Sequence, residues 1–243
     1  MNASKWFKFT AGIACRLLAA AFCLTAATPA FAQFSTLRIT EAMSQSGTTP
    51  TFTADWFEVT NFGSSAVDLT GWKMDDGSFN IAAAVALNGV SSIGAGESVV
   101  FVETSAPLTV IPDFRSFWGG SAATATIGSY TGSGVGFSSG GDGIALFNSE
   151  SRAATQVTFP AATLGSSFYY QYDPTTSPNA NAVVSTVGTI NGQVTYLSAN
   201  TVTQNIGSPG TAINAVPEPS ACFSLAAGLA FGGWNVLRRR RVR

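Results

Sequence analysis

Short runs of β-branched and aromatic residues recur through the middle of the chain, and clusters of Gly, Ser, Thr, Asn and Pro separate them. Apolar and polar residues alternate in residues 56–60 and 98–103, which is the period of a strand with one face buried. Helical spacing of apolar residues is nearly absent. Short strands joined by turns predict an all-β chain that folds as an antiparallel sandwich or barrel. The expected strands are residues 36–43, 56–61, 66–68, 72–75, 98–103, 143–148, 155–159 and 168–172.

Three stretches do not follow this pattern. Residues 112–118 are compatible with a short helix or with an aromatic-rich loop. Residues 119–143 are rich in glycine and predict a long loop whose turns need positive φ angles. This loop has no GK[ST] ending and precedes a strand, which excludes a phosphate-binding loop. Residues 174–210 are rich in Ser, Thr and Asn, with weak strand signals at 182–187 and 193–197, and form either closing hairpins or a partly disordered stalk.

The first 32 residues have every part of a secretory signal peptide. The positive n-region contains Lys5, Lys8 and Arg16. An uncharged apolar run follows at residues 17–24, and it is short for spanning a bilayer, which takes about 20 residues. The A-x-A sequence at residues 30–32 predicts cleavage between Ala32 and Gln33. We therefore expect the chain to be exported.

Without its two ends the chain is strongly acidic. Residues 33–216 contain four basic and twelve acidic side chains, a net charge of minus eight, although the whole chain is close to neutral. A body with this charge repels phosphate backbones, so nucleic acid is not an expected partner.

The residue types also exclude most catalytic chemistry. The chain has no histidine, and its cysteines are Cys15 and Cys23 in the signal peptide and Cys222 near the C-terminus. The usual general base, the Ser-His-Asp and Cys-His arrangements and zinc-thiolate sites are therefore missing from the body. We expect a protein that is not an enzyme.

A pair of carboxylates, as in glycosidases, is the one catalytic arrangement that the composition leaves open. Glu58 with Asp75 or Asp76 is a possible pair that the sequence does not place. Glu97 and Glu103 would be roughly 20 Å apart along one strand, which is too far for that reaction. We expect these acids to be solvated strand and loop residues.

Two binding roles are also open. Asp75, Asp76 and Asp142 lie in short acidic turns and are candidate calcium ligands, although the twelve-residue calcium loop is absent, and Asp-Gly turns explain them equally. No other cofactor is expected. Two aromatic clusters could bind carbohydrate, but core packing is the expected role of residues this large. They comprise Phe114, Phe117 and Trp118, and Tyr169, Tyr170 and Tyr172.

Residues 55–76 (DWFEVTNFGSSAVDLTGWKMDD), 93–103 (IGAGESVVFVE) and 140–151 (GGDGIALFNSES) together resemble the lamin-tail domain in its bacterial, secreted form. Residues 206–213 (IGSPGTAI) resemble the Gly-x-Pro-Gly end of that family. The resemblance implies an immunoglobulin-like β-sandwich over residues 33–213, with a core at about 34–172 and closing hairpins or a stalk at 173–213. It implies an interaction module and supplies no reaction.

Strand parity gives an expected orientation for the segment at residues 56–60. Phe57 and Val59 share a face that should point into the core. Val67, Leu69 and Trp72 should lie near them. Glu58 falls on the opposite face, beside Trp56 and Thr60.

Residues 214–243 (NAVPEPSACFSLAAGLAFGGWNVLRRRRVR) have a Pro-Glu-Pro motif, an uncharged apolar run and a block of arginines, and in that order they resemble the PEP-CTERM sorting signal of Gram-negative bacteria. Residues 221–237 are 17 uncharged residues, at the lower limit for a transmembrane helix. The motif before them is Val216, Pro217, Glu218, Pro219 and Ser220. The basic residues after them, which should remain cytoplasmic, are Arg238, Arg239, Arg240 and Arg241.

The sorting-signal resemblance implies a membrane anchor that an exosortase-type protease cleaves near residues 217–219. The body would cross the inner membrane, remain anchored there, and then reach the cell surface or an exopolysaccharide matrix. Exopolysaccharide and other surface proteins are the partners that this address suggests. The sequence does not identify a ligand or an oligomeric state.

Overall fold

A computed structural model describes residues 36–47, 52–171, 181–187 and 205–212, all within the unit Phe34–Arg243. A six-stranded sheet has the order β12-β11-β1-β2-β7-β8, and a four-stranded sheet has the order β10-β9-β4-β5. The first contains β1 (Leu37–Met43), β2 (Trp56–Asn61), β7 (Ser98–Glu103), β8 (Thr126–Tyr130), β11 (Phe168–Tyr170) and β12 (Ala182–Val184). The second contains β4 (Lys73–Asp75), β5 (Val85–Ala86), β9 (Asp142–Phe147) and β10 (Ala153–Phe159). A small ribbon pairs β3 (Val67–Asp68) with β6 (Ser92–Ile93).

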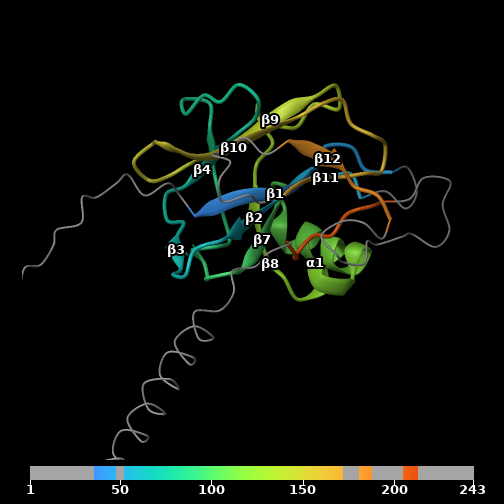
Figure 1. Ribbon diagram of the computed structural model, residues 1–243, viewed down its shortest axis with the longest axis horizontal. Helices are drawn as coiled ribbons and strands as arrows, with labels where there is room; N and C mark the ends of the chain where they lie inside the picture. The colour runs from blue at the N-terminus through green and yellow to red at the C-terminus, as the bar shows by residue number, and fades with distance from the viewer. Residues whose placement is uncertain (1–35, 48–51, 172–180, 188–204, 213–243) are drawn as a thin grey trace, which may run out of the picture. The chain divides into compact units, whose positions relative to one another are not determined.

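The main hydrophobic core lies between the two larger sheets. Figure 1 shows β9 and β10 lying over β1. Phe57 and Val59 of β2 point into this core together with Leu69 and Trp72, as strand parity predicts. Phe57 stacks on Phe101 with ring centroids 5.4 Å apart. The chain is therefore a mostly-β sandwich, and its fold class is as expected.

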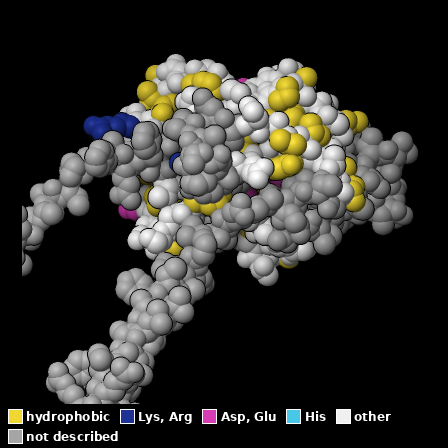
Figure 2. Space-filling view, in the orientation of Figure 1, with side chains coloured by type: hydrophobic (Ala, Val, Ile, Leu, Met, Phe, Trp, Pro, Cys, Tyr) yellow, Lys and Arg dark blue, Asp and Glu magenta, His cyan; other side chains and the backbone are white. Residues whose placement is uncertain are grey.

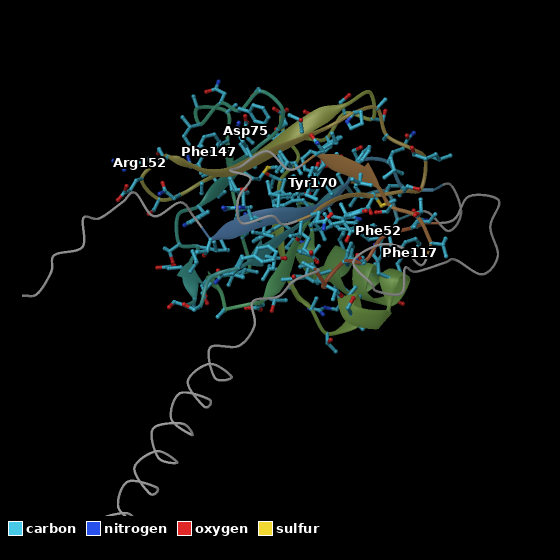
Figure 3. The ribbon with its side chains drawn as sticks, in the orientation of Figure 1. Phe52, Asp75, Phe117, Phe147, Arg152 and Tyr170 are labelled. Carbon is cyan, nitrogen blue, oxygen red and sulfur yellow. The ribbon has the colours of Figure 1, made fainter. Side chains whose placement is uncertain are left out.

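A helix covers part of the other face of the six-stranded sheet. Helix α1 (Pro107–Trp118) and the short 3₁₀ helix η1 (Gly120–Ala123) pack there over a second hydrophobic cluster. Trp56 of β2 makes edge-to-face contacts with Phe114 at 5.8 Å and with Trp118 at 5.5 Å. Phe117 of α1 lies beside Phe52, with ring centroids 5.8 Å apart (Figure 3). The aromatic-rich stretch is thus a helix, and it begins five residues before the stretch singled out in the sequence.

Strand β8 corrects the prediction of a continuous loop at residues 119–143. It pairs parallel to β7, so the sheet is not purely antiparallel. On the side of β8 that faces away from β7, Ser129 exchanges two backbone hydrogen bonds of 2.9 Å with Asn88. A Cβ on Gly128 would lie 2.6 Å from both the Asn88 carbonyl oxygen and the Phe101 ring, so glycine here allows close packing. Glycine content alone suggested turns, whereas the tertiary contacts make a strand.

Within the described ranges, no helix has the length and apolar character needed to cross a membrane. The predicted signal peptide, the sorting motif at residues 216–220, the span at 221–237 and the weak strand signal at 193–197 all lie outside those ranges.

The cluster beneath α1 predicts that two substitutions on that helix differ widely in their effect on the free energy of unfolding. Phe114 is fully buried, and Leu108 is 93% exposed. Phe114→Ala should lower the free energy of unfolding by about 3–5 kcal/mol, because it removes buried surface and leaves a cavity. Leu108→Ala, the control, should change it by less than about 0.5 kcal/mol. Urea unfolding followed by circular dichroism measures both, and equal effects would contradict this packing.

Candidate functional site

Two glutamates from neighbouring strands are buried together on the α1-side face of the six-stranded sheet. Glu41 of β1 is the register partner of Glu58 of β2, and both side chains are 0% exposed. The register of β1 shifts between Ile39 and Glu41, which marks a β-bulge. The bulge places Thr40 and Glu41 on the same polar face, whereas strict alternation would put Glu41 in the main core.

A segment from the far end of the described chain closes over this pair. We call residues 205–212 the strap. The Ser208 backbone N–H donates to Glu41 Oε1 (2.8 Å), and the Ser208 hydroxyl donates to Glu41 Oε2 (3.0 Å). The Gly210 N–H donates to Glu58 Oε2 (2.7 Å). The two glutamates therefore bind the strap through two of its backbone N–H groups and one hydroxyl.

Glycines in the strap allow this close approach. A Cβ on Gly207 would lie 2.8 Å from Glu41 Oε1 and 3.1 Å from the Trp118 ring. Gly210 has a φ of 89°, a backbone conformation that other residues rarely adopt. The resemblance of residues 206–213 to a Gly-x-Pro-Gly end thus has a physical basis in this contact.

Hydroxyl groups satisfy the remaining oxygen atoms of the pair. Thr40 donates to Glu58 Oε1 (2.5 Å), and Thr60 links Thr40 (2.9 Å) to Ser98 (2.7 Å). On the other side Ser167 donates to Glu41 Oε1 (2.5 Å). The site is a closed polar network between the sheet and the strap.

Burial raises both carboxyl pKa values. Desolvation raises the pKa of Glu41 from 4.5 to about 7, against the hydrogen bonds from Ser167 and Ser208, which lower it. Desolvation and then the charge of Glu41 raise the pKa of Glu58 from 4.5 to about 8. At neutral pH the pair holds a proton, because two adjacent buried negative charges are unfavourable.

A second carboxyl pair lies where β2 and β7 reach the glycine-rich loop. Burial and the charge of Glu103 raise the pKa of Asp55 from 3.8 to about 8, and Asp55 Oδ2 accepts a hydrogen bond from the Phe137 N–H (3.0 Å). A Cβ on Gly132 would overlap Glu103 Oε1, so the loop wraps closely around that side chain. This pair fastens the loop to the sheet.

The three candidate calcium ligands accept hydrogen bonds from backbone and hydroxyl groups of the loops around them. Asp142 accepts from the N–H groups of Gly77 (2.8 Å), Ser138 (2.7 Å) and Gly143 (2.9 Å). Asp76 accepts from the Ser78 N–H (2.9 Å), which is the predicted turn.

Asp75, in β4 of the four-stranded sheet (Figure 3), accepts from the Ser78 hydroxyl (2.7 Å) and the Asn80 N–H (2.6 Å). In the part of the chain that the structure describes, no three acidic side chains come together as a metal site.

The lamin tail domain sequence model matches residues 31–161, which is more than half of the chain. The chain belongs to the lamin tail domain family. Searches of curated proteins and of solved structures found no match. The family match ends before β11, so the strap lies outside the matched residues, although it packs on strands within them.

The lamin tail domain does not bring together the carboxylates that the sequence suggested as a pair. Glu58 belongs to the six-stranded sheet and Asp75 to the four-stranded sheet, and the partner of Glu58 is Glu41. The expectation that Glu58 is solvated is wrong, because the strap buries it. Glu41 was missed because a bulge cannot be read from alternation, although Thr40, Thr60 and Ser98 form a polar stripe that could have indicated it.

The aromatic clusters of the lamin tail domain are largely internal. Phe114 and Trp118 are buried beneath α1, as core packing predicts. Tyr170 is buried in the main core, and its hydroxyl donates to the Thr158 carbonyl (3.3 Å). Tyr169 is half-buried, and Tyr172 lies outside the described residues.

The raised pKa values predict that this domain loses stability as the pH rises. The folded pair holds protons that the unfolded chain releases above about pH 4.5, so the stabilisation is complete below that pH. The free energy of unfolding should fall by about 1.4 kcal/mol per pH unit for each proton released, until the pH exceeds the folded pKa of about 8.

Glu58→Gln should reduce this slope, because glutamine is neutral and keeps one acceptor oxygen. Glu150→Gln is the control, since the Glu150 side chain is 66% exposed. Urea unfolding from pH 5 to pH 9 measures the slopes, and equal slopes for all three proteins would contradict the buried pair.

Proposed function

We propose that this lamin tail domain protein is an exported, non-catalytic interaction protein of the cell surface or extracellular matrix. Its sequence supports export through the signal peptide at residues 1–32 and sorting through the PEP-CTERM-like tail at residues 214–243. The proposed route crosses the inner membrane of a Gram-negative bacterium, with the span at 221–237 as a temporary anchor.

The observation that carries the non-catalytic assignment is the use of the acidic side chains. Glu41 and Glu58 are sealed beneath the strap, where no substrate reaches them in the closed state. Asp142 accepts three hydrogen bonds from the backbone of its own chain. These carboxyl groups hold loops and the strap in place, and the chain contains no histidine to serve as a base.

The surface supports contact with uncharged or weakly charged partners. Figure 2 shows a described face with few acidic or basic side chains in view and with hydrophobic side chains at several separate places. A surface with few charged groups suits a hydrated polysaccharide matrix or other surface proteins, and the net charge of minus eight over residues 33–216 disfavours nucleic acid.

The sorting proposal predicts a shorter protein at the cell surface. Wild-type protein recovered from the surface should lack Arg238–Arg241, because an exosortase-type protease cleaves near residues 217–219. Glu218→Gln should retain the tail and remain in the membrane, whereas Glu150→Gln should be processed normally. Mass spectrometry of the intact protein measures the C-terminus. Wild-type surface protein that keeps its arginines would contradict the proposal.

Calcium binding is the second candidate function, and one observation favours it. Asp75 Oδ1 is buried without a hydrogen-bond partner. A cation at this atom would involve Asp75 and the nearby turn at Asp76.

Calorimetric titration separates the two candidates. We expect neither heat nor a change in melting temperature with Ca²⁺, because the other oxygen atom of Asp75 is already bonded within the loop. Titration with matrix polysaccharide should give heat if the matrix itself is the partner. A rise in melting temperature with Ca²⁺ that Asp75→Asn abolishes would favour the second candidate instead.

A further inference from the structure

The strap is fastened to the body at several separate places, although it is short. Besides Glu41 and Glu58, it contacts the loop after β1, where the Gly47 N–H donates to Asn205 Oδ1 (2.7 Å). The Ser121 hydroxyl of η1 donates to the Pro209 carbonyl (2.8 Å). A single parallel bridge joins Ile206 to Ser166.

The strap depends on polar contacts more than on apolar packing. Neither of the two hydrophobic clusters includes a strap residue. Its opening would therefore break mainly polar contacts, which include two backbone hydrogen bonds of Ile206, with Ser167 (2.9 Å) and Gly165 (2.7 Å). A segment of this kind can open locally at a lower free energy than the whole domain needs to unfold.

Three of the strap's hydrogen bonds go to the two carboxyl groups, whose charge state depends on pH. The hydrogen bonds described above to these carboxyl groups come from hydroxyl and backbone N–H groups, which are neutral. Two adjacent buried carboxylates repel each other strongly, and a proton on either one removes that repulsion.

Other charged or titratable groups on the packed elements have partners of their own. On β1, Arg38 donates to the Leu37 carbonyl (2.8 Å). On α1, Arg115 donates to the Ala122 and Ala123 carbonyls of η1, and Asp113 is exposed.

At the start of β7, Glu97 accepts from the Gly94 N–H and the Thr126 hydroxyl. At its end, Glu103 lies in the second carboxyl pair with Asp55. Tyr169 of β11 lies opposite Glu41 in the register and is uncharged at neutral pH.

We propose that Glu41 and Glu58 form a proton-dependent latch, which holds the strap closed while the pair keeps a proton and lets it open when both are ionised. On opening, the carboxyl O–H bond breaks, its proton passes to water, and both carboxylates become hydrated. The N–H groups of Ser208 and Gly210 then donate to water in place of the two glutamates.

The latch also has a consequence for the tail. This consequence rests on the proposed sorting function, whereas the latch does not. Val216 follows Ala212 by four residues, at most about 14 Å of extended chain. Release of the strap's eight residues would add up to about 28 Å between the body and the sorting motif. The open state therefore gives a membrane protease easier access to residues 216–220.

Hydrogen exchange of the full chain, followed by mass spectrometry, tests the latch directly. Purified in detergent, the wild type should show protection of a peptide covering residues 205–212 that falls about tenfold per pH unit for each proton released, from pH 5 to pH 8. The intrinsic pH dependence of exchange is divided out. A peptide from β7 should stay protected over the same range, which distinguishes local opening from global unfolding.

Two variants complete the experiment. In Glu41→Gln/Glu58→Gln the strap should stay protected at every pH, because neither side chain can ionise. Asp55→Asn removes the other acid with a strongly raised pKa and should leave the pH dependence of the strap unchanged.

Three results would overturn the latch. They are a wild-type strap whose protection does not change with pH, a slope that persists in the double variant, and a β7 peptide that loses protection together with the strap. If the double variant does not fold, the pH dependence of protection in the wild type is sufficient to test the latch. Failure of tail cleavage would contradict the sorting proposal and leave these outcomes unaffected.

Discussion

Strand β2 is buried along its whole length on both faces, and the rest of the structure follows from that constraint. Its residues alternate between two surroundings that must each be covered. Phe57 and Val59 face the four-stranded sheet across the main core. On the other face α1 covers Trp56, and the strap covers Glu58. A sandwich with a single buried face per sheet would leave half of this strand in water.

Burying the polar half of that second face costs desolvation free energy, and the hydrogen-bond network offsets this cost. Buried carboxyl groups are unfavourable unless their oxygen atoms are bonded and their charge is reduced. Here hydroxyl groups and strap N–H groups provide the bonds, and a retained proton reduces the charge. Under the proposed latch, the same device makes closure of the strap depend on pH, next to the tail that is proposed to direct sorting.

Much of the framework could be predicted from residue alternation. The expected ranges of β2 and β7 match the structure, and those of β1, β4, β9 and β10 differ from it by at most two residues at either end. Strand β8 could not be predicted, because Gly128 resembles a turn residue until the Phe101 ring and Asn88 are placed beside it. Glu41 could not be placed either, since a bulge shifts the parity of β1. The predicted carboxylate partner of Glu58 was wrong, because the pairing of β1 with β2 determines which side chain lies beside it.

The sequence by itself determined that this chain forms short strands with an inward face carrying Phe57 and Val59, because alternation with period two is a local property of an extended backbone. Its lack of histidine and of cysteine in the body also excluded most catalytic chemistry before any fold was known. Only the tertiary structure decided that Glu41 and Glu58 meet and that residues 205–212 close over them, 150 and more residues along the chain. Such contacts join distant segments, and their energies depend on burial and on hydrogen-bond geometry, which exist only after the sheets have packed.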